Sequence, residues 1–207
     1  YYSVFICLEA ESVVRILGGP QFMGAAPAVL VMALYPIHQG YGQLTESVYY
    51  AAGQTAMLRN ITIASALIGF AGAWLVVAPQ TWGGLDYGAG GLALKSVLIQ
   101  ALTVNISLWC CGRIIPIRLP RLWLHQILAL LFFATLAALP LGLEKLVPGL
   151  WTLPSLGLSA LTADILGLVL RGTLYTALVA GGVLACPWLV GLTRGDLREM
   201  YQRMRRR

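Results

Sequence analysis

Apolar residues run along this chain in long stretches, and short polar connections separate them. Each of five stretches is close to the about 20 residues that an α-helix needs to cross a lipid bilayer. They cover residues 24–52, 61–79, 90–111, 122–142 and 165–190. Because they are too long and too continuous for transmembrane strands, the pattern predicts an all-α integral membrane protein, a polytopic bundle with about five full transmembrane helices.

The beginning of the chain is apolar as well. Residues 1–17 start with "YYSVFICLEAE", without an initiator methionine and without the basic flank of a signal peptide. We interpret this segment as the end of a truncated further helix, and residues 1–207 as a single membrane domain cut from a longer protein. The arginine-rich residues 191–207 are expected to form a basic cytoplasmic tail.

Composition supports the membrane interpretation. Hydrophobic residues make up 58% of the 207 positions and charged residues 11%, whereas soluble domains carry charge on about a quarter of their residues. A chain this poor in charge cannot cover itself with a water-facing surface. The four cysteines (Cys7, Cys110, Cys111 and Cys186) lie in or beside apolar stretches without metal-site spacing, and we expect them to be small apolar filling residues.

The net charge is +6, and the positions of the basic residues along the chain predict the membrane topology. Basic residues collect at alternate connections: Arg59 after the first stretch, three arginines within 113–121, and the arginines from Arg194 onward. Because cytoplasmic loops of membrane proteins are rich in Lys and Arg, these connections and the C-terminus are predicted to be cytoplasmic. The same residues suit anionic headgroups, so we expect membrane lipids and no nucleic acid as partners.

Polar residues interrupt the first stretch at "YPIHQGYGQLTES", residues 35–47. Because each residue of an α-helix advances by about 100°, the polar residues of this stretch fall within about a third of the helix circumference, and the opposite side is apolar. The polar set consists of Tyr35, Gln39, Gly42, Gln43, Glu46, Tyr50 and Gln54. Pro36 lacks a backbone N–H group and is predicted to kink the helix.

Two further stretches carry stripes of their own. The stretch 90–111 has a polar stripe, which consists of Ser96, Gln100, Thr103 and Ser107 with Lys95 beside it. The stretch 61–79 has a stripe of small residues, which consists of Ser65, Gly69 and Gly72 with Ala66 and Ala73 alongside. Small residues on one face favour the close approach of another helix.

The polar stripes have two interpretations. They line a hydrated cavity, or they form a polar seam between packed helices, and for Gln39, Gln43 and Gln100 both remain open. A carboxylate within a span costs about 2.5–3.5 kcal/mol on insertion scales, so Glu46 is a functional candidate unless it lies at the cytoplasmic interface. His38 is either a proton carrier or a histidine bonded to a neighbouring helix.

Catalytic chemistry finds little support in the sequence. The two histidines, His38 and His125, lie in different stretches, and the sequence contains no HExxH, GxSxG or P-loop motif. We therefore expect neither an enzyme nor a bound cofactor or metal.

Three segments in order resemble a known family: "VVRILGGPQFMGAAPAVLVMALYPIHQGYGQL" (13–44), "YYAAGQTAMLRNITI" (49–63) and "DYGAGGLALKSVLIQALTVNISL" (86–108). They contain a G-x-x-[FY]-x-x-A element, a P-x-x-Q turn, an A-x-G-x-T element followed by a basic residue, and a glycine-rich helix start. This order is similar to that of the polysaccharide flippases of the multidrug/oligosaccharidyl-lipid/polysaccharide exporter superfamily, above all the bacterial O-antigen (lipopolysaccharide) translocases.

The resemblance implies the C-terminal lobe of a longer flippase in the bacterial inner membrane. Such a protein moves undecaprenyl-diphosphate-linked oligosaccharide to the outer face by alternating access, and its N-terminal lobe faces the same cavity. On this resemblance the substrate-binding candidates are Tyr35, Gln39, Gln43, Tyr50, Arg59, Lys95 and Gln100, and the ion-coupling candidates are His38 and Glu46. Glutamines would meet sugar hydroxyls, tyrosines would stack on sugar rings, and Lys95 or Arg59 would meet the diphosphate.

Three other interpretations remain open. A drug or cation exporter of the same superfamily would need an acidic site for organic cations, where the stretch 90–111 offers Lys95 instead. A membrane-embedded glycan polymerase or ligase would carry long outer loops with arginine and histidine, and the 144–157 loop has Lys145 and no histidine. A structural membrane subunit would satisfy its polar residues between helices.

Overall fold

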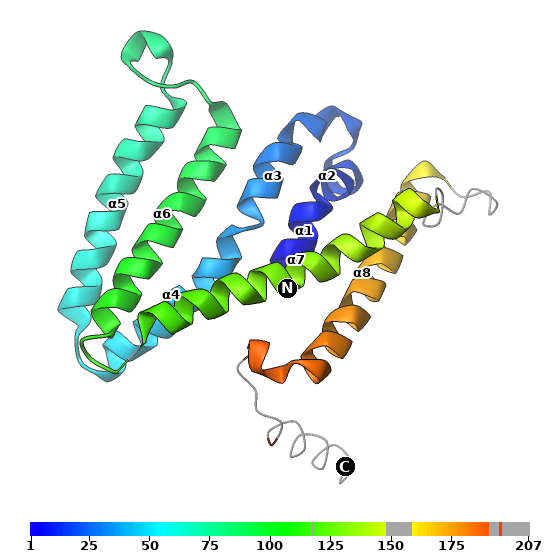
Figure 1. The fold of residues 1–207 in the computed structure, drawn as a ribbon. Coiled ribbons are helices and arrows are strands. Elements are labelled where there is room, and N and C mark those ends of the chain that lie inside the picture. Colours follow the sequence, from blue (N-terminus) through cyan, green and yellow to red (C-terminus); the bar gives the residue numbers. More distant parts are fainter. Residues whose placement is uncertain (117, 148–158, 191–194, 196–207) are drawn as a thin grey trace. The chain divides into compact units, whose positions relative to one another are not determined.

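The computed structural model describes residues 1–116, 118–147, 159–190 and 195, and the regular elements in these residues are all helical (Figure 1). Five segments are long and apolar enough to cross a membrane: Pro20–Ala51, Thr55–Val77, Gly88–Cys111, Leu119–Leu143 and Ala160–Ala185. The prediction of an all-α, multi-pass membrane protein is confirmed. The chain divides into two compact units, which are Tyr2–Pro120 and Arg121–Arg207 with Tyr1, and each is described by itself.

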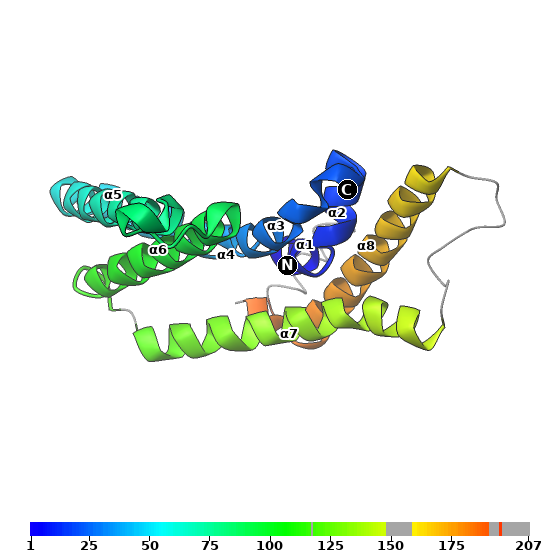
Figure 2. The same cartoon turned by 90° about the horizontal axis from the view of Figure 1, so that it is seen from above.

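The first unit is built around one helix. Its elements are α1 (Tyr2–Leu8), α2 (Ala10–Gly18), η1 (Pro20–Ala25), α3 (Ala26–Met32), α4 (Tyr35–Ala51), α5 (Thr55–Val77), η2 (Gln80–Trp82) and α6 (Gly88–Cys111). Helix α6 packs against α3, α4 and α5. In both views α6 runs beside α5, and Figure 1 shows α6 between α5 and α3 (Figure 1 and Figure 2). Helix α6 is thus the central support, and α5, which has no buried residue, stands at the edge.

The first expected span, 24–52, is broken into two helices. Helix α3 ends at Met32 and α4 begins at Tyr35, with Pro36 in its first turn. At the break the Leu34 N–H donates to the Val31 carbonyl at 3.0 Å, three residues back instead of the four of an α-helix. Proline cannot donate a hydrogen bond and its ring crowds the preceding turn, so the predicted kink is confirmed as an interruption of the helix.

The segment 1–17, expected as one helix end, forms two short helices. Helices α1 and α2 meet at Glu9, whose backbone angles (φ −101°, ψ 17°) depart from helical values. The Glu9 side chain is buried, with 4% of its surface exposed.

A tight loop joins α5 to α6. The backbone N–H groups of Leu85 and Tyr87 donate to the carbonyls of Leu75 and Val76, at 2.8 and 3.0 Å. Gly84 lies so close to the Ala78 carbonyl that a Cβ atom has no room there. The loop therefore folds back on the last turn of α5 and holds the two helices as one hairpin. The helices themselves cover 55–77 and 88–111, where 61–79 and 90–111 were expected.

The second unit contains α7 (Leu119–Leu146), α8 (Ala160–Ala185) and η4 (Pro187–Val190). The predicted helix 165–190 is shifted: α8 begins at Ala160, where the Ser159 side chain accepts a hydrogen bond from the Thr162 N–H at 3.3 Å. It ends at Ala185, because Pro187 forces Cys186 out of the helical region to φ −127°, ψ 64°. Helix α7 extends beyond the expected 122–142 at both ends. Most of the 144–157 loop and of the basic tail 191–207 lies outside the described residues.

Candidate functional site

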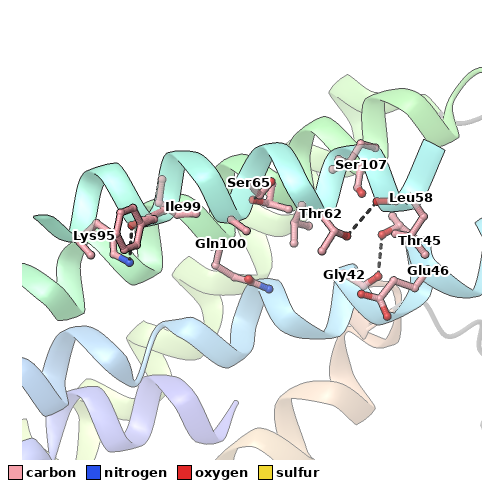
Figure 3. Close-up of a pocket in the computed structure, with 17 residues that line it drawn as sticks. Gly42, Thr45, Glu46, Leu58, Thr62, Ser65, Lys95, Ile99, Gln100 and Ser107 are labelled. Carbon is pink, nitrogen blue, oxygen red and sulfur yellow. Dashed lines mark hydrogen bonds between the residues drawn. The ribbon is translucent and has the colours of Figure 1, made fainter. Parts of the chain in front are cut away.

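A pocket of about 590 Å³ lies among α4, α5 and α6 (Figure 3). We call it the polar pocket because charged, amide and hydroxyl side chains line it beside apolar ones. This volume falls within the about 300–1,000 Å³ that small-molecule sites usually occupy. Helix α4 contributes Gly42, Thr45 and Glu46 to the lining, α5 contributes Leu58, Ile61, Thr62, Ser65, Ala66, Gly69, Phe70 and Ala73, and α6 contributes Lys95, Ile99, Gln100, Thr103, Val104 and Ser107.

A glycine brings α4 against α6 at this pocket. A Cβ atom on Gly42 would lie 3.4 Å from Val104 Cγ2 and 3.7 Å from Gln100 Nε2, which is already van der Waals contact. One turn further along α4, the Thr45 hydroxyl donates to the Gly42 carbonyl at 2.7 Å and so needs no partner outside its own helix. The Gln100 amide is thereby held next to α4, in the middle of the pocket (Figure 3).

Beyond Glu46, a buried cluster closes the contact between α4 and α6. The Tyr49 side chain is fully buried, and its hydroxyl donates to the Ser107 backbone carbonyl at 2.9 Å. Cys111 Sγ lies 3.9 Å from the Thr45 carbonyl and donates to it weakly. Tyr49 and the buried Cys110 and Cys111 form one apolar core cluster. The expected role of these two cysteines as small apolar filling residues is confirmed.

Small residues let α5 approach α6 closely. A Cβ atom on Gly72 would lie 3.3 Å from Lys95 Cγ, so the aliphatic stem of Lys95 lies directly on the α5 backbone. The Lys95 ammonium donates to the Gly69 carbonyl at 3.2 Å, and the Thr103 hydroxyl donates to the Ser65 hydroxyl at 2.8 Å. The predicted close approach is confirmed. Thr103 forms a polar contact between the two helices and also lines the pocket, so both interpretations of the stripe apply to this residue.

The two charged residues of the pocket lie at opposite ends. Lys95 is at one end, Glu46 is at the other, and Gln100 points into the space between them (Figure 3). Lys95 is half-buried and Glu46 is exposed. Charged side chains within membrane spans face a bundle interior or a water-filled cavity, because hydrocarbon does not solvate them. The pocket therefore presents one cation, one carboxylate and a central amide beside apolar side chains.

The structure brings only part of the candidate set together. Glu46, Lys95 and Gln100 line the pocket, whereas the other candidates do not. Those outside the lining are Tyr35, His38, Gln39, Gln43 and Tyr50 on α4 and Arg59 on α5. Gln39, Gln43, Tyr50 and Arg59 have exposed side chains, and Tyr35 and His38 are half-buried.

Among the described residues, His38 stands out for an unsatisfied ring atom. Its Nδ1 is buried and has no hydrogen-bond partner. His38 lies one turn after the break between α3 and α4. Of the two alternatives for this histidine, a bond to a neighbouring helix is therefore not formed through Nδ1.

Sequence reasoning missed some residues of the site. Thr62 lines the pocket, although its hydroxyl donates to the Leu58 carbonyl of its own helix at 3.0 Å. The available signal was its spacing: Thr62 lies three residues before Ser65 and seven before Gly69, on the same side of α5. Tyr49 was missed because a tyrosine in an apolar run looks like any lipid-facing aromatic. In the described part of the chain, no three metal-ligating side chains gather in one place.

The fold and the pocket define the class of this protein, a multi-pass α-helical membrane protein with a polar pocket among three helices of one unit. The chain matches no family model, and no curated protein or solved structure is significantly similar to it.

Proposed function

We propose that the chain is part of a membrane flippase that moves undecaprenyl-diphosphate-linked oligosaccharide, such as an O-antigen repeat unit, across the bacterial inner membrane. The observation that carries this proposal is the polar pocket among α4, α5 and α6, which lies within three apolar membrane-crossing segments. The pocket also falls within residues 13–108, which resemble polysaccharide flippases. The C-terminus is cytoplasmic in this proposal, and a second lobe of the same protein faces the pocket.

The pocket lining suits the polar part of such a substrate. The Gln100 amide and the hydroxyls of Thr62 and Ser65 offer donors and acceptors to sugar hydroxyl groups. Of the three N–H donors of the Lys95 ammonium, the Gly69 carbonyl takes one, and two remain for a diphosphate. Glu46 lies at the other end of the pocket, where it repels the diphosphate and is free to exchange a coupling ion.

The exposed polar side chains of α4 extend the same surface. Gln39, Gln43 and Tyr50 lie on a membrane-crossing segment but are not covered by the unit, so in this proposal they face the water-filled pathway. The interruption between α3 and α4 supplies a hinge for alternating access. At this point the N–H groups of Leu34 and Ile37 bond to carbonyls three residues back instead of four, so the α-helical pattern is not continuous.

Reconstitution tests the proposal directly. The full-length protein in proteoliposomes should speed the transfer of a labelled undecaprenyl-diphosphate-linked oligosaccharide between leaflets above the rate of protein-free liposomes. Lys95→Met should reduce this rate, and Lys95→Arg should keep part of it because the positive charge is retained. Transfer at the protein-free rate, with a correctly folded protein, would reject the proposal.

A second function of the same superfamily has one observation in its favour. Glu46 is an exposed carboxylate at the pocket, and an exporter of organic cations needs such a group. Lys95 in the same pocket opposes a cationic ligand. Uptake of a fluorescent organic cation into inverted vesicles, lost in Glu46→Gln and unchanged in Lys95→Met, would favour the exporter over the glycan flippase.

A further inference from the structure

A second hollow lies on the other side of the α5–α6 hairpin. It has a volume of about 280 Å³ and a lining that is nearly all apolar. Ile61, Ala64 and Ile68 form its α5 wall, and Ile99, Leu102 and Ile106 form its α6 wall. We call this hollow the apolar groove.

The apolar groove is separate from the polar pocket. The wall between them is the contact of α5 with α6, where Thr103 donates to Ser65 at 2.8 Å, and both residues line both spaces. The described residues that line the groove belong to α5 and α6, and none of them belongs to α4. Its residues Ile68, Leu102 and Ile106 are 51%, 48% and 39% exposed, so the groove faces the bilayer of a membrane-crossing hairpin.

The length of the groove matches one leaflet. Its α5 wall runs from residue 60 to residue 68, which spans about 12 Å at about 1.5 Å per residue. Half of a hydrocarbon core of about 30 Å is about 15 Å. The volume lies just below the about 300–1,000 Å³ of sites for compact small molecules, and it suits part of a single hydrocarbon chain better than a headgroup.

A polar side chain marks one end of the groove. Asn60 lies about a turn and a half from the Thr55 end of α5, and it lines the groove next to the isoleucines. Its amide makes no hydrogen bond to any other described residue. An amide near the boundary of the hydrocarbon core needs an acceptor, and the ester and phosphate oxygens of a phospholipid lie at that depth.

We propose that the apolar groove binds one acyl chain of a phospholipid from the leaflet at the Thr55 end of α5, with the Asn60 amide donating a hydrogen bond to the ester or phosphate oxygens of that lipid. The bound chain fills the gap along the α5–α6 contact. This site does not depend on the transported substrate, since the Ser65–Thr103 seam separates it from the polar pocket.

Photo-crosslinking in nanodiscs tests the site. The probe is phosphatidylethanolamine with a diazirine in the acyl chain, and mass spectrometry maps the adducts on the purified protein. We expect adducts to concentrate on the groove residues of α5 and α6. Ile63 and Leu67, which are 52% and 67% exposed on α5 and line neither hollow, should carry far fewer. Equal labelling of groove and control residues would mean ordinary boundary lipid and would overturn the proposal.

Substitutions inside and outside the groove test which residues the labelling depends on. Ala64→Trp fills the groove and should abolish the concentrated labelling, whereas Ala71→Trp, exposed on the same helix outside both hollows, should leave it unchanged. Asn60→Leu should reduce it by about fivefold, which corresponds to the about 1 kcal/mol of one hydrogen bond. Unchanged labelling in both groove variants would contradict the proposal. So would displacement of the probe by an equimolar polyprenyl phosphate, because the groove would then prefer an isoprenoid chain.

Discussion

The hydroxyl of Tyr49 donates a hydrogen bond to the backbone carbonyl of Ser107 at 2.9 Å, and this bond ties α4 to α6 beside the polar pocket. Tyr49 is fully buried among Cys110 and Cys111. The bond fixes the position of Glu46, which lies on the preceding turn of α4 at the end of the pocket.

We predict that Tyr49→Phe destabilises the protein by about 1 kcal/mol, because the ring still packs while the interhelical hydrogen bond is lost. Thermal unfolding of the purified protein in detergent measures the change. The matched control is Tyr50→Phe, since Tyr50 is 64% exposed and its loss of a hydroxyl should leave the melting temperature unchanged. Equal effects of the two substitutions would contradict the role given to Tyr49.

The Thr103–Ser65 hydrogen bond should couple α5 to α6 energetically. In a double-mutant cycle with Thr103→Val and Ser65→Ala, we expect a coupling free energy of about 0.6 kcal/mol, the average for interhelical hydrogen bonds in membranes. Chemical unfolding of the single and double variants gives this value. A cycle that pairs Thr103→Val with Thr62→Val should show no coupling, because Thr62 bonds within its own helix. Strict additivity in the first cycle would show that the seam contributes nothing.

Gly72 should not tolerate a larger side chain. A Cβ atom there already lies 3.3 Å from the Lys95 stem, so Gly72→Leu should push α5 from α6 and lower the free energy of unfolding by about 1–3 kcal/mol. Gly181→Leu serves as the control, because a Cβ atom on Gly181 meets nothing within 4 Å. If both variants melt alike, the close contact between α5 and α6 does not exist.

The five spans and the polar side of α6 could be predicted from the sequence because they depend on local pattern, whereas of the polar set expected on α4 only Gly42 and Glu46 line the pocket. Long apolar stretches define spans, and a period of about 3.6 residues places Gln100 and Thr103 on one side. Pro36 marks the start of a new helix, whereas Pro140 stands inside α7 without ending it. Contacts between helices could not be predicted. Nothing in the sequence distinguishes Thr103, whose hydroxyl bonds to Ser65 of α5, from Gln100, whose amide points into the pocket, because the difference depends on which helix lies opposite.

The C-terminal end of α8 is another feature that the apolar pattern did not predict. Hydrophobicity continues to residue 190, and the helix nevertheless ends at Ala185. The backbone restriction that Pro187 places on Cys186 outweighs the apolar pattern. A span boundary set by hydropathy alone therefore misses a stop that the proline specifies.

Glu46 should matter for transport and not for insertion. In cells that depend on the full-length protein for glycan export, we predict that Glu46→Gln lowers export by about tenfold, or about 1.4 kcal/mol of barrier, because it removes the carboxylate at the end of the pocket. Immunoblotting of membranes checks that the amount of protein is unchanged. The control is Glu11→Gln, an exposed carboxylate on α2, which should export normally. Wild-type export by Glu46→Gln would remove Glu46 from the mechanism.

The central claim is that the pocket among α4, α5 and α6 is a hydrated, substrate-facing space, and thiol labelling of Gln100→Cys tests it most directly. Cys7 and Cys186 are first replaced by serine, and the buried Cys110 and Cys111 stay. We expect Gln100→Cys to react with a water-soluble maleimide and to be protected by lipid-linked oligosaccharide. Leu98→Cys, an exposed position on α6 outside the pocket lining, should react slowly because it faces lipid. A Gln100→Cys variant that reacts no faster than Leu98→Cys, or that substrate leaves unprotected, would contradict the account.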